Sequence, residues 1–323
     1  MDDPLTTAPN PGSLSKPSRD YDGSFQPGEA YLQALPDMQN AHADHISGAR
    51  VAINQVGISN FKLPLKFKTR TGQVVSLETS VTGTVSLDKD NKGINMSRIL
   101  RVFYQFKDDV FTWEEIEKIL NTYLERLESE EARLKLFFNY PIAQTSLRSN
   151  MQGYQYYQVM WEGALKNAGE LHRYIQLDFV YSSTCPCSEM LSEHAREARN
   201  VYSIPHSQRS KARVLVELDE SSEMTNEDLV DHCANALMTE TQVIVRREDE
   251  QAFAELNGAY VKFVEDAARL LFEELDAEEQ ILDFQVSIAH LESLHSHDAV
   301  AVVTKGIPHG FQGQFDDFRQ LIC

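Results

Sequence analysis

The chain has 323 residues, of which 42% are apolar, so it is long enough to form one large domain or two of ordinary size. Its formal net charge of −19 excludes the basic footprint that nucleic-acid binding requires, so an anionic substrate would need local arginine and lysine partners. No apolar run is long enough to cross a bilayer and the acidic start lacks a signal-peptide pattern, so we expect a cytoplasmic protein.

Cysteine usage is that of a protein with free thiols. Four cysteines in 323 residues are too few for a disulfide framework. Cys185 and Cys187 stand one residue apart, and a bridge between them would close a strained ring, so we expect both to be thiols. Cys233 lies in a helix-like stretch and is expected in the core, whereas Cys323 is terminal and uninformative.

The start of the chain has the composition of a tail. Residues 1–48 carry six of the eleven prolines and few apolar residues, so they have little surface to bury and many backbone breaks. We expect this segment to be disordered or extended. Two ordered units then follow, at 49–168 and 169–323, and each carries strand and helix patterns.

The first unit contains one clear strand and one clear helix. Apolar and polar residues alternate over 74–87, which predicts a half-buried strand. An apolar stripe at helical spacing covers 112–127, and Thr112 stands three residues before Glu115, which is the spacing of a capping box. The closing strands of this unit are predicted at 133–140 and 154–165.

The second unit repeats this order. Its predicted strands are 174–181, 212–218, 281–288 and 299–303, and its predicted helices are roughly 226–239 and 258–275. Two copies of strand–strand–helix–helix–strand–strand predict an α+β fold with antiparallel sheets. The halves show no sequence self-similarity, so the duplication is a hypothesis drawn from the pattern of elements alone.

Residues with metal-binding or acid–base chemistry follow the strands of the second unit. Cys185 and Cys187 lie where strand 174–181 ends, and a thiolate there could bind zinc or another divalent metal; the alternative is two small residues at a turn. His206 stands just before strand 212–218. A metal held by these cysteines would need histidine or carboxylate as its other ligands, because the chain has no CxxC pair.

Two histidines share a short connection between strands. His295 and His297 are two residues apart, so their imidazoles point to the same side if the backbone is extended. With Asp298 next to them, they could act as acids and bases or bind a metal, although single histidines are more often structural or solvated.

A helical carboxylate is the third candidate. Glu265 lies on the border of the apolar stripe of helix 258–275, so it is either a rim residue or a buried acid held for a ligand. A carboxylate can accept the paired amino and ring N–H groups of guanine or a pterin. The acidic run 248–250 would ordinarily be a solvated loop.

The same stretches resemble motifs of one family, in order. The motifs are "KGINMSRIL", "STCPCSEML", "HSQRS", "RREDEQAF", "FVED" and "ESLHSHDA". They resemble the KGxHMSR, TxCPCS, HNQRS, KRPDEKYV, FVED and ES-H-x-HDA segments of the type IB GTP cyclohydrolases, and the resemblance covers about residues 36 to 305. It implies hydrolysis of GTP at C8 with release of formate to give 7,8-dihydroneopterin triphosphate, for folate-type pterins or queuosine-type bases.

The resemblance also implies roles for individual residues. The implied metal ligands are Cys185, His206 and Glu250, and the metal would be manganese or zinc, with iron(II) also compatible. Glu265 would anchor the guanine, and His295, His297 and Cys187 would lie near the reacting ring. Our candidates for the triphosphate are Arg98, Arg209 and Lys211, because cationic side chains, and the arginine fork above all, fit phosphate oxygens.

Three departures from the family pattern stand out. About nine additional residues separate Cys185 from His206, which predicts a longer helix or loop beside the site. Asn95 stands where a histidine is common, and Gln251 stands where a lysine is common.

The fold implied by the resemblance is the tunnelling fold, a four-stranded antiparallel sheet with two helices, present twice in the chain. Because an open sheet exposes unpaired edges, we expect a homo-oligomer, a homotetramer, with sites between subunits. Two alternatives remain open at this point. One is a non-catalytic protein that binds a purine or pterin and carries a structural metal. The other is a tunnelling-fold enzyme of deazapurine metabolism that acts through a reactive cysteine.

Overall fold

A computed structural model describes residues 19–36, 47–166 and 169–323. The strands in these residues are β1 (Ile53–Lys68), β2 (Val74–Leu87), β3 (Val110–Phe111), β4 (Glu131–Thr145), β5 (Gln152–Lys166), β6 (Leu171–Thr184), β7 (Ser207–Leu218), β8 (Ile281–His290) and β9 (Ala299–Thr304). The helices are α1 (Glu29–Gln33), α2 (Met96–Phe103), α3 (Trp113–Leu127), α4 (Pro186–Arg199), α5 (Asn226–Leu237), α6 (Arg247–Ala259), α7 (Val264–Asp276) and the 3-10 helix η2 (Phe318–Leu321).

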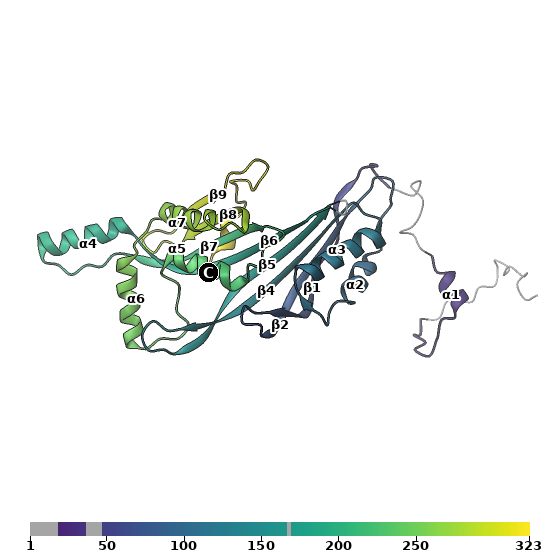
Figure 1. Ribbon diagram of the computed structural model, residues 1–323, viewed down its shortest axis with the longest axis horizontal. Coiled ribbons are helices and arrows are strands. Elements are labelled where there is room, and N and C mark those ends of the chain that lie inside the picture. Colours follow the sequence, from purple (N-terminus) through teal and green to yellow (C-terminus); the bar gives the residue numbers. More distant parts are fainter. Residues whose placement is uncertain (1–18, 37–46, 167–168) are drawn as a thin grey trace, which may run out of the picture.

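All nine of these strands lie in one sheet, in the order β3-β1-β2-β4-β5-β6-β7-β8-β9. Every neighbouring pair is antiparallel except β1 and β3. The two halves of the chain meet where β5 pairs with β6, from Gln158 opposite Asp178 to Leu165 opposite Leu171. The long strands therefore run side by side across the whole molecule (Figure 1). The predicted α+β class is confirmed, and the strands form one continuous sheet.

The strands that were predicted from alternating apolar and polar residues are present in the structure. The strand predicted at 74–87 is β2, with the same bounds. The predicted helix at 112–127 is α3, and the Thr112 side chain accepts a hydrogen bond from the Glu114 N–H at 3.3 Å as its N-cap. Glu115 contacts the Thr112 hydroxyl rather than the backbone, so the cap is present without the reciprocal half of a capping box.

The helices α2, α3, α5 and α7 cover one face of the sheet, and the hydrophobic core lies between these helices and the sheet. On β4 the core-facing side chains alternate with exposed ones, so that Leu134, Leu136 and Phe138 are buried while Phe137 is not. Gly163 in β5 lies directly beneath α3, where an added Cβ would overlap Ile116 and lie 3.1 Å from Leu120. The absence of a side chain therefore allows α3 to pack closely on the sheet.

We expect Gly163→Ala to destabilise the protein by about 1–3 kcal/mol, because the new methyl group forces α3 away from β5. The free energy of unfolding in urea measures this effect. Gly258→Ala is the matched control, since its Cβ meets nothing within 4 Å and it lies in α6, where alanine is the better helix former. Equal stability of the two variants would contradict the close packing of α3.

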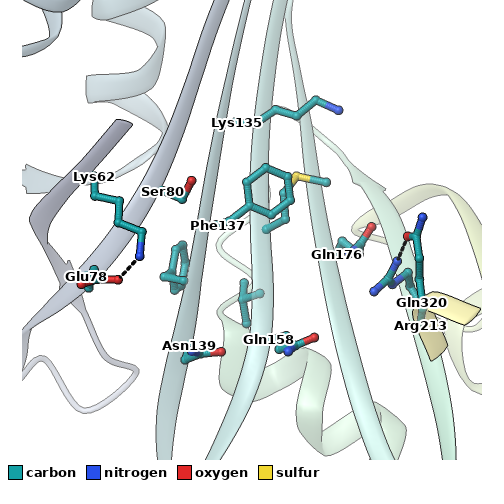
Figure 2. Close-up of a pocket in the computed structure, with 13 residues that line it drawn as sticks. Lys62, Glu78, Ser80, Lys135, Phe137, Asn139, Gln158, Gln176, Arg213 and Gln320 are labelled. Atoms are coloured by element: carbon teal, nitrogen blue, oxygen red, sulfur yellow. Dashed lines mark hydrogen bonds and ion pairs between the residues drawn. The ribbon is translucent and has the colours of Figure 1, made fainter. Parts of the chain in front are cut away.

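The opposite face of the sheet carries polar side chains. A cavity of about 550 Å³ lies on it, and Figure 2 shows Lys62, Lys135, Gln158 and Gln176 around it. The chain after β9 crosses this face, where Gln320 accepts a hydrogen bond from Arg213 at 2.9 Å (Figure 2). The sheet therefore has one apolar, helix-covered face and one polar face.

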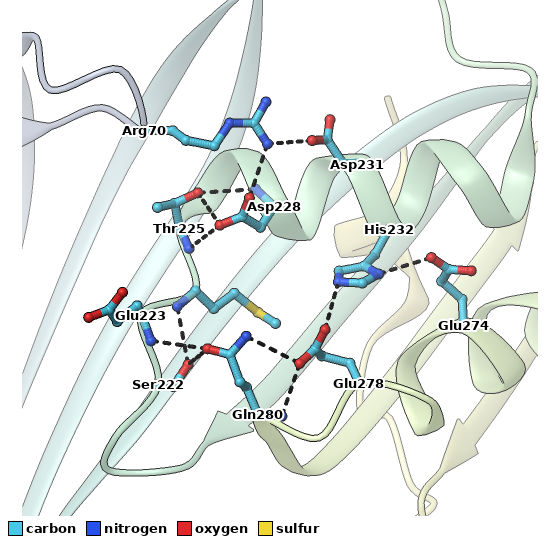
Figure 3. Close-up of polar contacts among 11 residues, drawn as sticks. Arg70, Ser222, Glu223, Thr225, Asp228, Asp231, His232, Glu274, Glu278 and Gln280 are labelled. Carbon is cyan, nitrogen blue, oxygen red and sulfur yellow. Dashed lines mark hydrogen bonds and ion pairs between the residues drawn. The ribbon is translucent and has the colours of Figure 1, made fainter.

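The turn between β1 and β2 contacts a helix of the other half of the chain. The Arg70 guanidinium pairs with Asp228 at 3.0 Å and with Asp231 (Figure 3). The Arg70 backbone N–H donates to Glu227 at 3.0 Å. Glu227 also accepts from the Tyr140 hydroxyl at 2.8 Å. The ion pairs are half exposed and contribute little singly, but the buried Glu227 links β4, this turn and α5.

A second contact holds α5 against the end of α7. The His232 ring lies 2.9 Å from Glu274 and 3.6 Å from Glu278 (Figure 3). The helices that cover the second half of the sheet are thus joined by polar contacts as well as by the core.

The prediction of one continuous helix at 258–275 is wrong. The chain breaks between α6 and α7, where the Lys262 N–H donates to the Thr184 carbonyl at 3.1 Å and so is held against the end of β6. The acidic run 248–250 forms the first turn of α6 rather than a loop. Asp249 is fully buried there and accepts hydrogen bonds from the Arg148 and Ser149 N–H groups, so the carboxylate joins α6 to the turn after β4.

The additional residues between Cys185 and His206 form α4 and its return segment. This helix projects beyond the end of the sheet, at the left of Figure 1. Ser192 is its only buried residue, and Ser203 in the return segment donates to the Ser192 carbonyl at 2.8 Å. The helix is therefore held mainly at its base and by its own return segment.

The predicted tail falls partly outside the described residues. Within 19–36 the structure has α1, none of whose residues is buried. Residues 1–18 and 37–46 lie outside the described residues, so the prediction for them stays a prediction.

Candidate functional site

The candidate site lies where β6 ends and β7 begins. Cys185 follows β6 and is the N-cap of α4, and His206 precedes β7, as the sequence predicted. The last paired residues of the two strands are Thr184 and Ser207. The Cys185 N–H donates to the His206 carbonyl at 3.2 Å, so this pair continues the antiparallel ladder by one step. Directly opposite residues of such a ladder place their side chains on the same face, close together.

A row of polar side chains continues from this pair into the core. Ser183 lies opposite Gln208, and Tyr181 lies opposite Ser210, so both pairs share the face of Cys185 and His206. The Gln208 amide donates to the Ser183 hydroxyl at 2.8 Å, and the Ser183 and Ser210 hydroxyls are 2.7 Å apart. All of these side chains are buried. We call Ser183, Gln208 and Ser210 the polar row.

The His206 ring is held from one side. Its Nδ1 lies 3.1 Å from the Gln208 Oε1 atom and 3.5 Å from a carboxylate oxygen of Glu292, in the connection after β8. The His206 and Glu292 side chains are only 18% and 14% exposed. The His206 N–H donates to the Ser188 hydroxyl of α4 at 3.1 Å, which fixes the backbone as well.

Two buried bases lie at the inner end of the polar row. The His290 Nε2 is 2.8 Å from the Tyr181 hydroxyl, and burial, reinforced by the charge of Lys262, lowers the His290 pKa to about 4. Burial alone lowers the pKa of the Lys262 ammonium to about 8. Lys262 donates to the Thr239 hydroxyl at 3.3 Å and to the Tyr260 carbonyl, and no ion pair with a carboxylate is found for it among the described residues. His290 is therefore neutral at physiological pH.

Lys262 makes stability depend on pH. Its folded pKa of about 8 lies below the ordinary lysine value of 10.5, so between these pH values the unfolded chain binds more protons and stability rises with pH. We expect Lys262→Met to be most stabilising relative to the wild type below pH 8. The difference in the free energy of unfolding between the variant and the wild type should shrink by up to about 3 kcal/mol by pH 10.5. Urea unfolding of both proteins at pH 7 and pH 10 measures it, and a pH-independent difference would contradict a desolvated ammonium.

The two candidate glutamates lie in the first turns of helices. Glu250 is in the first turn of α6 and Glu265 is in the first turn of α7, and both are exposed in the chain. Glu265 was predicted at the border of a longer helix, and the structure instead places it just after the break that Lys262 anchors. Carboxylates are favoured at this end of a helix, where the backbone N–H groups are free.

His295 and His297 lie in the exposed connection between β8 and β9. Their rings are stacked, with centroids 4.7 Å apart and planes 12° apart. The two imidazoles lie together, although residues 293–297 form bends rather than the extended backbone that the prediction assumed. Cys187 is exposed in the first turn of α4, and all four cysteines are free thiols, with Cys233 buried as predicted.

Two of the three triphosphate candidates, Arg209 and Lys211, do not share the face of His206. Arg209 and Lys211 alternate with Gln208 and Ser210 along β7, so their side chains point to the polar face of the sheet. Lys211 is buried there, 3.5 Å from Asp178, which also accepts from Arg213 at 2.7 Å. Arg98 lies on α2 and donates to the Arg126 carbonyl at 3.3 Å. Their role in binding phosphate stays a prediction.

The predicted metal ligands come together only in part. Cys185 and His206 supply a thiol and an imidazole on neighbouring strands, which suits a divalent metal. Among the described residues of one chain, however, no group of three or more His, Cys, Asp or Glu side chains lies close enough to hold an ion. The full ligand set of Cys185, His206 and Glu250 therefore stays a prediction.

The polar row and Glu292 were not predicted from the sequence. The signal for them was present in "HSQRSKARVLVEL", where Gln208 and Ser210 occupy the positions that become core-facing once the strand continues to Ala212 and Val214. Polar residues at core-facing positions require buried partners, which is a reason to look for a network.

Comparisons with known proteins agree with the motifs. The family model described as "Type I GTP cyclohydrolase folE2" matches residues 35–301. A "GTP cyclohydrolase FolE2" of Ruegeria sp. (strain TM1040) is 54% identical over 289 residues, which cover 89% of this chain and 78% of that protein. Another, of Cereibacter sphaeroides (strain KD131 / KCTC 12085), is 50% identical over 306 residues, which cover 94% and 85%.

Among solved structures, a uricase from Arthrobacter globiformis superposes with a TM-score of 0.47 at 12% identity, covering 82% of this chain and 96% of that one. That similarity is too low to support an argument about this chain. No helix among the described residues has the length and apolar content needed to span a membrane.

Proposed function

Because this chain belongs to the FolE2 family of type I GTP cyclohydrolases, we propose that it hydrolyses GTP at C8, releases formate and forms 7,8-dihydroneopterin triphosphate. The observation that carries the proposal is the cross-strand pair of Cys185 and His206 in the motifs that match the family. The product would serve folate-type pterins or queuosine-type bases, in the cytoplasm.

The reaction would use a divalent metal, Mn²⁺ or Zn²⁺, with Fe²⁺ also compatible. Cys185 and His206 would bind it, and Glu250 would complete the set once chains assemble. When bound, such an ion supplies a Lewis acid that lowers the pKa of water toward neutrality. The side chains of the chain provide binding, orientation and proton transfer.

Glu265 would recognise the base. Its carboxylate can accept hydrogen bonds from the guanine N1–H and from the exocyclic amino group together. Its exposed position at the start of α7 leaves both oxygens free for a ligand. The triphosphate would be bound by Arg98, Arg209 and Lys211, some of them from a second chain, because the side chains of Arg209 and Lys211 do not lie on the face of His206.

Proton transfer would fall to the stacked histidines. A protonated imidazole of His295 or His297 could protonate N7 of the purine, which makes C8 electrophilic and favours attack by water. Stacking holds the two imidazoles next to each other in the exposed connection between β8 and β9. Cys187, exposed in the first turn of α4, would lie near the reacting ring.

The chain would contain two tunnelling-fold units and assemble as a homotetramer. The order of elements supports this division, because the first half contributes β1–β5 to the common sheet, the second half contributes β6–β9, and each half carries at least two helices. The sheet ends at β9 on one side and at the two-residue β3 beside β1 on the other, so its edges are available to other subunits. Such assembly would bring together site residues that one chain leaves apart.

Turnover by the purified protein tests this function directly. Metal-free protein is incubated with GTP, Mn²⁺ or Zn²⁺ is added in turn, and formate and a fluorescent pterin after oxidation are measured. We expect both products only with metal and only with GTP, with ATP as the control nucleotide. A protein that carries metal but releases no formate would contradict the proposal.

A further inference from the structure

We propose that Gln208, held by Ser183 and Ser210, fixes His206 in the neutral tautomer that carries its proton on Nδ1. His206 then presents an unprotonated Nε2 to the site. The inference rests on the proposed role of His206 as a metal ligand, and it assigns Gln208 as a positioning residue that never touches the metal.

The first step is the placement of these residues on one face. Positions 206, 208 and 210 alternate along the start of β7, so their side chains follow one another on the face that the helices cover. Gln208 is only 9% exposed, and Ser183 and Ser210 are fully buried. A buried glutamine must satisfy both ends of its amide, because an unpaired polar group there costs about 1–3 kcal/mol.

The second step is the location of the proton on His206. Nδ1 faces two groups, the Gln208 amide at 3.1 Å and the Glu292 carboxylate at 3.5 Å. An ionised carboxylate can only accept, so a proton on Nδ1 is the arrangement that suits it. The neutral imidazole then has its free lone pair on Nε2, which is the nitrogen available to a metal.

The third step is the direction of the Gln208 amide. If Nδ1 carries the proton, Gln208 must present Oε1 to it, and its NH₂ group then donates to the Ser183 hydroxyl at 2.8 Å. The Ser183 and Ser210 hydroxyls, 2.7 Å apart, continue the chain into the core. The Ser183 and Ser210 hydroxyls can each donate or accept, so they accommodate this orientation of Gln208. The Glu292 carboxylate, which can only accept, favours the proton on Nδ1, and Gln208 then supplies the second acceptor for it.

The consequence concerns affinity for the metal. A histidine whose proton is held on Nδ1 by an acceptor needs no reorganisation before it binds through Nε2, and it is a more basic ligand. Loss of such a partner typically weakens metal binding by roughly 10–100-fold. Gln208 and Glu292 supply this partner together.

The test compares Gln208→Met with Gln208→Glu. Methionine keeps the length but removes the acceptor, whereas glutamate keeps an acceptor for Nδ1–H and can accept from Ser183. We expect Gln208→Met to weaken Zn²⁺ binding by roughly 10–100-fold in competition with a chelator, and Gln208→Glu to restore most of it. The visible spectrum of the Co²⁺-substituted protein should change in the methionine variant only. Gln176→Met, a half-buried strand glutamine on the polar face, should match the wild type.

His206→Ala separates this inference from the proposed function. If His206→Ala loses Zn²⁺ but Gln208→Met binds it like the wild type, the positioning role is overturned and the metal site stands. If His206→Ala itself binds Zn²⁺ normally, the proposed ligand is wrong and the inference is overturned with it. Retained circular dichroism and thermal unfolding show that each variant folds. If the methionine variant fails to fold, Glu292→Leu removes the other acceptor of the His206 Nδ1–H group. We expect it to weaken Zn²⁺ binding by the same roughly 10–100-fold.

Discussion

Cys185→Ala is expected to remove bound metal and to reduce formate release by roughly 100-fold or more, because a proposed ligand is lost and the Lewis acid with it. The substitution should leave the fold intact. Cys185 is half-buried at the end of β6, and the backbone bond from its N–H to His206 does not depend on the side chain. Metal content by mass spectrometry and formate release from GTP measure the two effects.

Cys323→Ala is the control for this variant. It removes a thiol that is also half-buried, but near Lys211 and Arg209 rather than beside His206. We expect normal metal content, which makes it the control for the loss of metal in Cys185→Ala. If Cys185→Ala released formate at the wild-type rate, the reaction would have to take place elsewhere in the molecule.

Glu265→Ala is expected to weaken use of GTP by at least roughly 100-fold in kcat/KM, since two hydrogen bonds to a charged group contribute about 1.5–3 kcal/mol each. The bound metal should be unaffected, which distinguishes this variant from Cys185→Ala. Steady-state kinetics with GTP and metal content measured on the same preparation check both statements.

Glu273→Ala is the matched control, because it is an exposed glutamate of the same helix, two to three turns further along. It should behave like the wild type. A Glu265→Ala variant with unchanged kcat/KM would show that another group recognises the guanine.

The strands that were predicted from apolar alternation agree with the structure, but their polar ends were missed, and β1 was not predicted although Phe61, Leu63 and Leu65 alternate in it. The strand predicted at 212–218 begins at Ser207 in the structure, and the one predicted at 174–181 continues to Thr184. The missing residues are polar because they form the row that leads to His206. Local alternation of hydrophobicity cannot identify such positions, since their partners lie on the neighbouring strand.

The break before Glu265 could not be predicted for a similar reason. Val261 and Val264 continue the apolar stripe across it, so the pattern favours one helix. The break is fixed by the bond from the Lys262 N–H to the Thr184 carbonyl, a contact between distant parts of the chain. The rings of His295 and His297 do lie together, but residues 293–297 form bends, so their stacking does not follow from the extended backbone that the prediction assumed.

The seam between β5 and β6 has a consequence for how this chain can be divided. Eight consecutive residue pairs join the halves there, from Gln158 with Asp178 to Leu165 with Leu171. A chain cut between these strands would expose the backbone N–H and C=O groups of β5 and β6 as two new unpaired edges, which promotes aggregation. The halves should therefore melt together in one transition, and neither should be obtainable as a well-behaved fragment, even though each carries its own helices.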